Sequence, residues 1–202
     1  MTQRVLLASA SPRRAELLRQ LGLSFETGPV DIDETPFSGE GPGEYVERLA
    51  QEKALEGYRR FGGDRSLVLG SDTTVVLDGH ILGKPVDIAD AVQLLRALSG
   101  REHQVMTGVA LATESGVQAR VSVTAVSFRE LDPREIEAYC ATGEPMDKAG
   151  GYGIQGRGGA FVTAISGSYS AVVGLPLDIT ASLLADAGLP VWDYWTSSIN
   201  GE

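Results

Sequence analysis

The chain has little of the chemistry that redox centres and many metal sites require. Its 202 residues include one cysteine, Cys140, and two histidines, His80 and His103. A single thiol cannot form an internal disulfide, and two imidazoles leave little material for histidine-based metal sites or catalytic triads. The pattern around Cys140 predicts a helix with a buried, inert thiol, and this cysteine usage fits a reducing cytoplasm.

Long apolar runs and an excess of positive charge are missing as well. No stretch approaches the roughly 18 consecutive apolar residues of a membrane-spanning helix, and the opening MTQRVLLASASPRR places arginines directly after a short apolar run. We therefore expect a cytoplasmic protein without membrane contact. The net charge of −10 opposes nucleic acid binding. A polyphosphate ligand would need a few placed lysines and arginines and a divalent metal.

What is present is an alternation of strand and helix signals typical of an α/β fold. Hydrophobic residues make up 43% of the chain, enough for the core of one domain spanning residues 1–202. Residues 4–8 predict a buried strand, and Ser11 and Pro12 predict the start of the helix that follows. Two long alternating segments predict a hairpin that turns near residues 114–116, at the centre of a mixed sheet.

Residues 66–82 predict two strands, and a turn that begins at Gly70 determines where Asp72 is placed. We predict one strand over 67–69 that ends in a turn at 70–72, and a second strand over 74–77. The second strand pairs with residues 80–82 across the turn Asp78-Gly79. Asp72 is therefore expected at the end of a strand, where binding residues are common.

Two further segments indicate a ligand site. In the helix predicted after residue 43, Lys53 falls on the apolar face by its helical spacing from Tyr45 and Leu49. The segment GEPMDKAGGYGIQGRGG, residues 143–159, is too rich in glycine for regular structure and indicates a binding loop.

The motif LASASPRR offers a place for an anion. It predicts a strand, a serine-rich turn and a helix N-terminus that carries Arg13 and Arg14. Unpaired N–H groups at such a terminus attract phosphate. An ordinary capped helix with solvated arginines is the alternative, so this motif alone decides little.

Carboxylates and lysines elsewhere could complete a triphosphate site. Glu34, in an acidic segment, and Asp72 offer the oxygen ligands that Mg²⁺ or Mn²⁺ prefers. Asp72 also suits a general base that takes a proton from the attacking water, beside the metal or alone. Lys53 and Lys84 would offset phosphate charge. Each lysine taken singly is better explained as solvated surface, so the hypothesis depends on the whole set.

Several long blocks of the sequence resemble the Maf family of nucleotide pyrophosphatases, in order and over nearly the whole chain. They are LASASPRRAELL, DETP, YVERLAQEKA, GSDTTVVLDGHILGKP, KAGGYGIQGRGGAFV and ISGSYSAVVGLPL. The resemblance implies an α/β fold with an elongated, mixed, twisted sheet flanked by helices and two lobes around a nucleotide cleft. It also implies a divalent metal and often a homodimer.

The resemblance assigns roles to positions that match the family's motifs. It implies that Asp72 is the catalytic acid. It places the other residues in the phosphate and nucleotide loop (Ser9, Arg13 and Arg14), the acidic segment (Glu34), the helix (Lys53) and the GKP motif (Lys84).

Three positions indicate a subgroup of the family. Arg13, Thr73 and Gln155 together resemble the subgroup that cleaves dTTP and UTP, whereas the subgroup acting on 7-methylguanosine triphosphate is expected to carry glutamate in the glycine loop. A glutamine amide offers one donor and one acceptor, which match the acceptor and N3–H of uracil or thymine. A solvated loop residue is the alternative for Gln155.

These observations predict an enzyme that hydrolyses dTTP and UTP to the monophosphate and pyrophosphate. One alternative is a nucleotide-binding regulator of septum formation or cell division without significant turnover, an association that the family resemblance carries. The other is a broader hydrolase of modified pyrimidine triphosphates. A candidate base together with Lys53 and Lys84 favours turnover, because binding alone needs no base.

Overall fold

The computed structural model describes residues 3–63 and 66–195. The chain divides into two compact units. The first unit takes residues 1–72, 107–122 and 174–202, and the second takes residues 73–106 and 123–173. The break between residues 72 and 73 falls inside a strand, so that this strand contributes residues to both units.

Within the described residues, seven strands form one mixed sheet. They are β1 (Arg4–Leu7), β2 (Phe25–Thr27), β3 (Ser66–Leu77), β4 (His80–Leu82), β5 (Glu102–Thr113), β6 (Gly116–Phe128) and β7 (Val162–Ser166). Their order is β2-β1-β3-β5-β6-β7, and β4 pairs with β3. The strand β1 runs parallel to β2 and β3, whereas β3 and β4 pair antiparallel. The predicted α/β class with a mixed sheet and flanking helices is confirmed.

Helices connect most of these strands. The α-helices are α1 (Pro12–Arg19), α2 (Pro42–Phe61), α3 (Ile88–Leu98), α4 (Pro133–Cys140), α5 (Tyr169–Val173) and α6 (Leu177–Asp186). Helix α1 starts as predicted, with Pro12 in its first turn and the Ser11 side chain accepting a hydrogen bond from the Arg14 N–H. The segment near the end that was predicted as a strand or docking tail is not a strand but the 3₁₀ helix η4 (Val191–Tyr194). It docks on the rest of the first unit, where Trp195 Nε1 donates to the Leu21 carbonyl at 3.0 Å.

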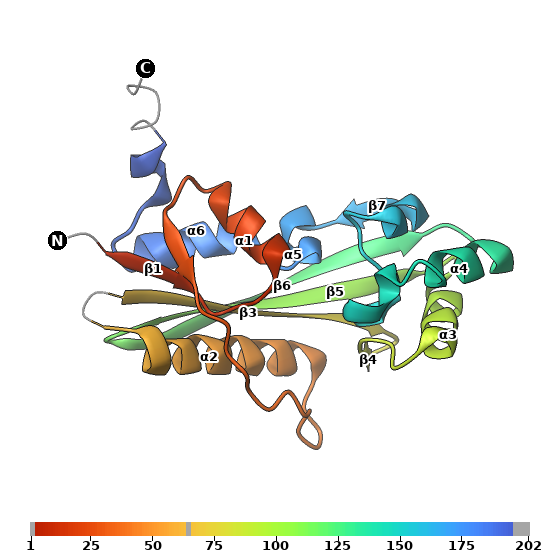
Figure 1. The fold of residues 1–202 in the computed structure, drawn as a ribbon, viewed down its shortest axis with the longest axis horizontal. Coiled ribbons are helices and arrows are strands. Elements are labelled where there is room, and N and C mark those ends of the chain that lie inside the picture. The colour runs from red at the N-terminus through yellow and green to blue at the C-terminus, as the bar shows by residue number, and fades with distance from the viewer. Residues whose placement is uncertain (1–2, 64–65, 196–202) are drawn as a thin grey trace. The chain divides into compact units, whose positions relative to one another are not determined.

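In the first unit, α2 covers one face of the strands and α1 and α6 lie on the other (Figure 1). The core on the α2 side is built from small and branched residues, because α2 lies very close to the sheet. These residues include Leu6, Ala8, Ala50, Ala54, Val68, Ala110 and Ala112. A Cβ atom added at Gly57 would lie 2.7 Å from the Ala8 Cβ.

The predicted turn at residues 70–72 is wrong, because β3 continues unbroken from Ser66 to Leu77. Gly70 is needed for packing against α2 and not for a turn. A Cβ atom there would lie 2.5 Å from the backbone nitrogen of Ala54, so glycine is needed for the close approach of α2. Asp72 consequently lies inside a strand and not at its end.

The second unit has its own core, in which α3 and α4 pack together. Its β3–β4 hairpin turns at Asp78 and Gly79 with φ values of 51° and 79°, as the predicted two-residue turn requires. Cys140 is buried here as predicted, and burial raises the pKa of its thiol.

The glycine-rich segment is more regular than predicted. It folds into three short 3₁₀ helices, η1 (Glu144–Asp147), η2 (Ala149–Gly151) and η3 (Arg157–Phe161). Gly150 and Gly151 have φ values of 67° and 72°, a region that favours glycine. The backbone conformation at these two positions therefore favours glycine.

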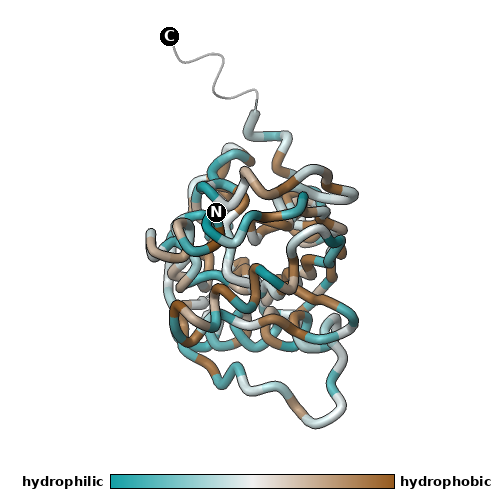
Figure 2. Tube along the Cα trace, turned by 90° about the vertical axis from the view of Figure 1, so that its right-hand side faces the viewer, coloured by the Kyte–Doolittle hydropathy of each residue, from teal (hydrophilic) through white to brown (hydrophobic). Residues whose placement is uncertain are grey.

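Hydrophobic and hydrophilic residues are interspersed along the trace (Figure 2). Of the helices in residues 3–63 and 66–195, none has both the length and the apolar character needed to cross a membrane.

Candidate active site

Two carboxylates share one ammonium group in the first unit. Lys53 Nζ lies 2.7 Å from Asp72 Oδ1 and 2.6 Å from Glu34 Oε1. The side chains of Lys53 and Asp72 are 12% and 11% exposed, whereas that of Glu34 is 48% exposed. The cluster is therefore sheltered on the Lys53 and Asp72 side and open to solvent at Glu34.

The packing of α2 on β3 brings Lys53 and Asp72 together. In a strand, residues two apart face the same side, so Asp72 faces α2 as Gly70 does. The missing side chain at Gly70 lets the helix approach at Ala50 and Ala54. Lys53 lies in the same turn of α2, and its ammonium consequently reaches the carboxylate.

A second set of contacts ties the acidic segment to α2. The guanidinium of Arg48 pairs with both carboxylate oxygens of Glu40 at 2.6 and 2.8 Å and donates to the carbonyl of Thr35 at 3.2 Å. It also lies 4.0 Å from the centre of the Phe37 ring. Arg48 thus holds the residues that follow Glu34, a role that its place in the sequence did not reveal.

Tyr45 of α2 anchors the same segment from its other end. Its hydroxyl donates to the carbonyl oxygen of Glu34 at 2.9 Å. Burial raises the pKa of Tyr45 to about 12, and the negative charges of Asp72 and Glu34 add to this effect. The tyrosine therefore remains a neutral donor beside the two carboxylates.

The opening loop lies beside this cluster. Ser9 Oγ accepts from the Ser11 N–H at 3.1 Å and lies 3.5 Å from Arg14 Nη1. Desolvation lowers the pKa of Arg14, an effect that the charge of Asp72 opposes and that of Arg13 increases. Arg14 is therefore within electrostatic range of Asp72.

One backbone carbonyl orients Arg14. The Gly174 oxygen accepts from Arg14 Nε at 2.8 Å and lies 2.9 Å from Ser71 Oγ. Ser71 is fully buried and precedes Asp72 in β3. The position of Ser71 next to the candidate catalytic aspartate is a feature of the sequence that could have pointed to a role for this serine. Its partner Gly174 could not have been identified, because it lies far from Ser71 in the sequence.

Thr73, Lys84 and Gln155 belong to the second unit. Thr73 follows Asp72 in β3 and is partly buried, whereas Lys84 and Gln155 are exposed. The Gly150 N–H donates to the Gly83 carbonyl at 3.0 Å. The segment that carries Lys84 is therefore joined to the glycine-rich segment that carries Gln155.

The chemistry of Glu34 and Asp72 suits a divalent cation. Among the residues that the structure describes, no group of three or more His, Cys, Asp and Glu side chains is arranged to hold a metal ion. Mg²⁺ at nucleotide sites commonly takes only one or two carboxylates and completes its coordination with water and phosphate oxygens. Two carboxylates that meet at the Lys53 ammonium supply oxygen ligands of that kind.

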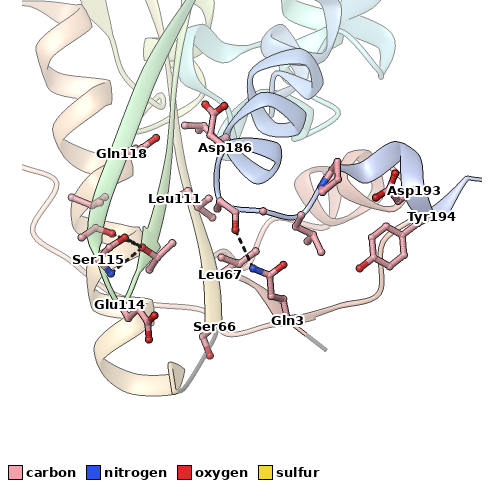
Figure 3. Close-up of a pocket in the computed structure, with 18 residues that line it drawn as sticks. Gln3, Ser66, Leu67, Leu111, Glu114, Ser115, Gln118, Asp186, Asp193 and Tyr194 are labelled. Carbon is pink, nitrogen blue, oxygen red and sulfur yellow. Dashed lines mark hydrogen bonds between the residues drawn. The ribbon is translucent and has the colours of Figure 1, made fainter. Parts of the chain in front are cut away.

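A separate pocket of about 900 Å³ lies at the other end of the first unit's strands (Figure 3). It is lined by Gln3 and Ser66 at the strand starts and by Glu114 at the hairpin tip. Ser66 and Asp72 are six residues apart in β3, so the pocket lies about 20 Å from the carboxylate cluster at the usual rise per residue. None of the proposed site residues lines it.

The fold and the cluster together define an α/β protein with a lysine–carboxylate site flanked by arginines. A family model described as Maf-like protein matches residues 4–187. The chain belongs to the Maf family, as the sequence motifs predicted.

Several curated relatives are similar over most of their length. The chain is 56% identical over 191 residues to the dTTP/UTP pyrophosphatase of Shewanella sp. (strain MR-7), with 92% of this chain and 98% of the relative covered. It is 53% identical over 201 residues to the dTTP/UTP pyrophosphatase of Aromatoleum aromaticum, with 93% and 97% covered. A solved nucleoside-triphosphatase / dITP/XTP pyrophosphatase from Mycobacterium abscessus aligns with a TM-score of 0.43 at 22% identity, over 64% of this chain and 76% of that structure.

Proposed function

We propose that the chain hydrolyses dTTP and UTP to the nucleoside monophosphate and pyrophosphate. The observation that carries this proposal is the cluster in which Lys53 lies between Asp72 and Glu34. The relatives named dTTP/UTP pyrophosphatase, which are 53 to 56% identical, support the substrate class.

In this proposal, water attacks the α phosphorus. A new P–O bond forms to the water oxygen, and the bond from the α phosphorus to the bridging oxygen breaks. Pyrophosphate leaves with the bridging oxygen, and Asp72 takes the proton of the attacking water. Lys53, which donates to Asp72 Oδ1 at 2.7 Å, holds the carboxylate in place for that transfer.

Cationic side chains would bind the triphosphate. Arg13 and Arg14 lie in the first turn of α1, where the helix N-terminus also favours an anion. Ser9 orders the turn that leads into this helix through its bond to the Ser11 N–H. Lys84 of the second unit is exposed and would add a further positive charge.

Glu34 and Asp72 are the proposed ligands of Mg²⁺ or Mn²⁺. Such an ion, when bound, would neutralise phosphate charge and acidify a bound water.

Gln155 and Thr73 are the proposed selectivity residues. Gln155 is exposed and lies in a hydrogen-bonded turn. Its amide could pair with the O4 and N3–H edge of uracil or thymine. Thr73 is joined directly to Asp72 along β3, so its conformation is coupled to that of the proposed base.

The test is pyrophosphate release from dTTP, UTP, CTP and GTP with Mg²⁺ or Mn²⁺, for the unaltered chain and for Asp72→Asn. The substitution keeps the shape of the side chain but removes the base, so kcat should fall roughly a hundredfold or more. Asp178→Asn is the matched control, because Asp178 is exposed on α6 and outside the cluster.

Full activity in Asp72→Asn would remove Asp72 from the mechanism. Turnover confined to GTP would overturn the pyrimidine assignment. Binding of nucleotides without any pyrophosphate release would contradict the proposal of an enzyme and support a nucleotide-binding regulator.

A further inference from the structure

The carboxylate of Glu144, in the second unit, lies against the turn that carries Gln155. The turn is closed by the hydrogen bond from the Gly156 N–H to the Gly153 carbonyl at 3.1 Å, with Ile154 and Gln155 as its central residues. Gln155 is exposed. The backbone of the turn is therefore fixed while this side chain points to solvent.

Glu144 accepts hydrogen bonds from the chain that leaves the turn. Its Oε2 accepts from the Arg157 N–H at 3.1 Å, and its Oε1 accepts from the Gly158 N–H at 3.2 Å. Backbone donors to a carboxylate are charge-assisted and stronger than neutral pairs. The Glu144 side chain is 16% exposed, so water competes weakly for these bonds.

Tyr139 connects the same carboxylate to the chain that enters the turn. Its hydroxyl accepts from the Gly153 N–H at 3.2 Å and donates to Glu144 Oε1 at 3.0 Å. The ring is buried and packs edge-on against Phe161 with centroids 4.9 Å apart. Glu144 thus holds both ends of the turn, one directly and one through a rigid tyrosine.

The glycines of this segment are explained by the carboxylate. A Cβ atom at Gly156 would lie 2.6 Å from the Glu144 Cδ, and one at Gly158 would lie 2.8 Å from the Tyr139 hydroxyl. Any larger residue would displace the anchoring groups. The run of glycines therefore reflects a tightly held turn.

The charge state of Glu144 suits this role. Burial alone would raise its pKa, but the Gly158 and Arg157 N–H groups and the Tyr139 hydroxyl bring the pKa below its ordinary value. At neutral pH the group is an anion that can accept all three bonds.

We propose that Glu144 is a positioning residue for nucleobase selection, which fixes the Gly153–Gly156 turn so that Gln155 meets the base in one orientation. The inference rests on the proposed function, because it needs Gln155 to contact the base. Neither Glu144 nor Tyr139 is expected to touch the phosphates.

The test is a double-mutant cycle on pyrophosphate release with Glu144→Gln, Gln155→Ala and both together. Glutamine keeps the size of the side chain but places an NH₂ group where an acceptor is needed. We expect KM for dTTP to rise roughly tenfold with kcat largely retained, as for one lost hydrogen bond to a charged group. The kcat/KM ratio of dTTP over GTP should fall, and Glu144→Gln should add little in the Gln155→Ala background.

Glu137→Gln is the matched control, since Glu137 is exposed on α4. Tyr139→Phe is the second variant, which removes only the hydroxyl, and should reproduce the KM effect if Glu144→Gln fails to fold. Additive effects of Glu144→Gln and Gln155→Ala, or a loss of kcat with unchanged selectivity, would overturn the inference.

The outcomes separate the two proposals. If Gln155→Ala changes the substrate ratio but Glu144→Gln and Tyr139→Phe do not, the positioning role is wrong and the proposed function stands. If the unaltered chain releases no pyrophosphate, or Gln155→Ala leaves the ratio unchanged, base reading by Gln155 fails and the inference fails with it.

Discussion

At the scale of single residues, the sharing of one ammonium by two carboxylates determines the electrostatics of the proposed site. Lys53 forms an ion pair with Asp72 and another with Glu34 at contact distance. Two carboxylates that face one another repel, and a cation between them offsets that repulsion. The lysine therefore holds both carboxylates at one point of the site.

Replacing Lys53 by Gln should expose that repulsion. We expect kcat to fall at least roughly tenfold. Glutamine leaves the two carboxylates without a positive charge between them, so Asp72 is no longer held in place. The measurement is kcat for dTTP.

The double variant Lys53→Gln and Glu34→Gln is the informative comparison. Removing Glu34 removes the charge that repels Asp72, so the double variant should lose less kcat than the two single variants would lose together. Additive losses would show that Lys53 does not link the two carboxylates.

At the scale of secondary structure elements, the site depends on how closely α2 lies against the sheet. Gly70 and Gly108 both face backbone atoms of α2: added Cβ atoms would lie 2.5 Å from the Ala54 nitrogen and 2.7 Å from the Val46 carbonyl carbon. The helix cannot accommodate a methyl group at either place without moving. Because α2 carries Lys53, such a movement would also disturb the contact with Asp72.

Gly70→Ala should therefore reduce stability and activity together. Overpacking of this kind costs about 1–3 kcal/mol of unfolding free energy. Activity should fall in the folded protein as well, because Lys53 and Asp72 separate. Urea unfolding and kcat/KM measured on the same preparation test this prediction.

Gly43→Ala is the control, since nothing lies within 4 Å of a Cβ atom at Gly43, within α2. This substitution should leave stability unchanged or raise it slightly, because alanine favours helix. Equal losses in both variants would mean that the close approach at Gly70 is not what matters.

The elements also show what could be predicted from sequence. The start of α1 and the turn at Asp78-Gly79 were predictable because caps and two-residue turns are local signals. The unbroken course of β3 was not, because glycine marks turns and close packing alike. The five-residue helix α5 was missed as well, being too short for a periodic pattern.

Part of the candidate site was likewise predictable from the sequence, and part was not. Helical spacing correctly placed Lys53 near the apolar face of its helix. The contact of Lys53 with Glu34 depends on Arg48 and Tyr45 holding the acidic segment, and such contacts between separate elements have no local signal. The anchoring of the glycine loop by Glu144 was missed for the same reason.

At the scale of the whole molecule, the negative net charge opposes the binding of a polyanionic substrate. The net charge is −10, yet the first unit gathers Arg13, Arg14 and Lys53 around Asp72 and Glu34. A triphosphate would thus be attracted by placed groups and not by the net charge, which favours a specific nucleotide over nonspecific polyanions.

Acid should weaken the folded molecule through His103. This residue is 2% exposed, and its Nε2 lies 2.7 Å from the Tyr152 hydroxyl. Its Nδ1 is buried and has no hydrogen-bond partner in the described part of the chain. Burial lowers the pKa of His103 from 6.5 to about 4. The folded state therefore favours the neutral ring.

The sign of the effect follows from proton binding. Below pH 6.5 the unfolded chain protonates His103 while the folded chain does not, so stability falls as the pH drops toward 4. At pH 5 the loss relative to pH 7 should be about 2 kcal/mol. Glutamates whose pKa is lowered in the folded state, such as Glu40 and Glu56, add a smaller loss of the same sign near pH 5. The share of the histidine is therefore taken from a variant that lacks it.

Urea unfolding at pH 7 and pH 5 measures that loss, with His103→Gln as the diagnostic variant. Glutamine can keep a hydrogen bond to Tyr152 but has no proton to gain, so most of the difference between the two pH values should disappear. His80→Gln is the control, because His80 is exposed. If His103→Gln keeps the full pH dependence, acid sensitivity must come from the carboxylates, and burial of His103 would not govern the acid stability of the molecule.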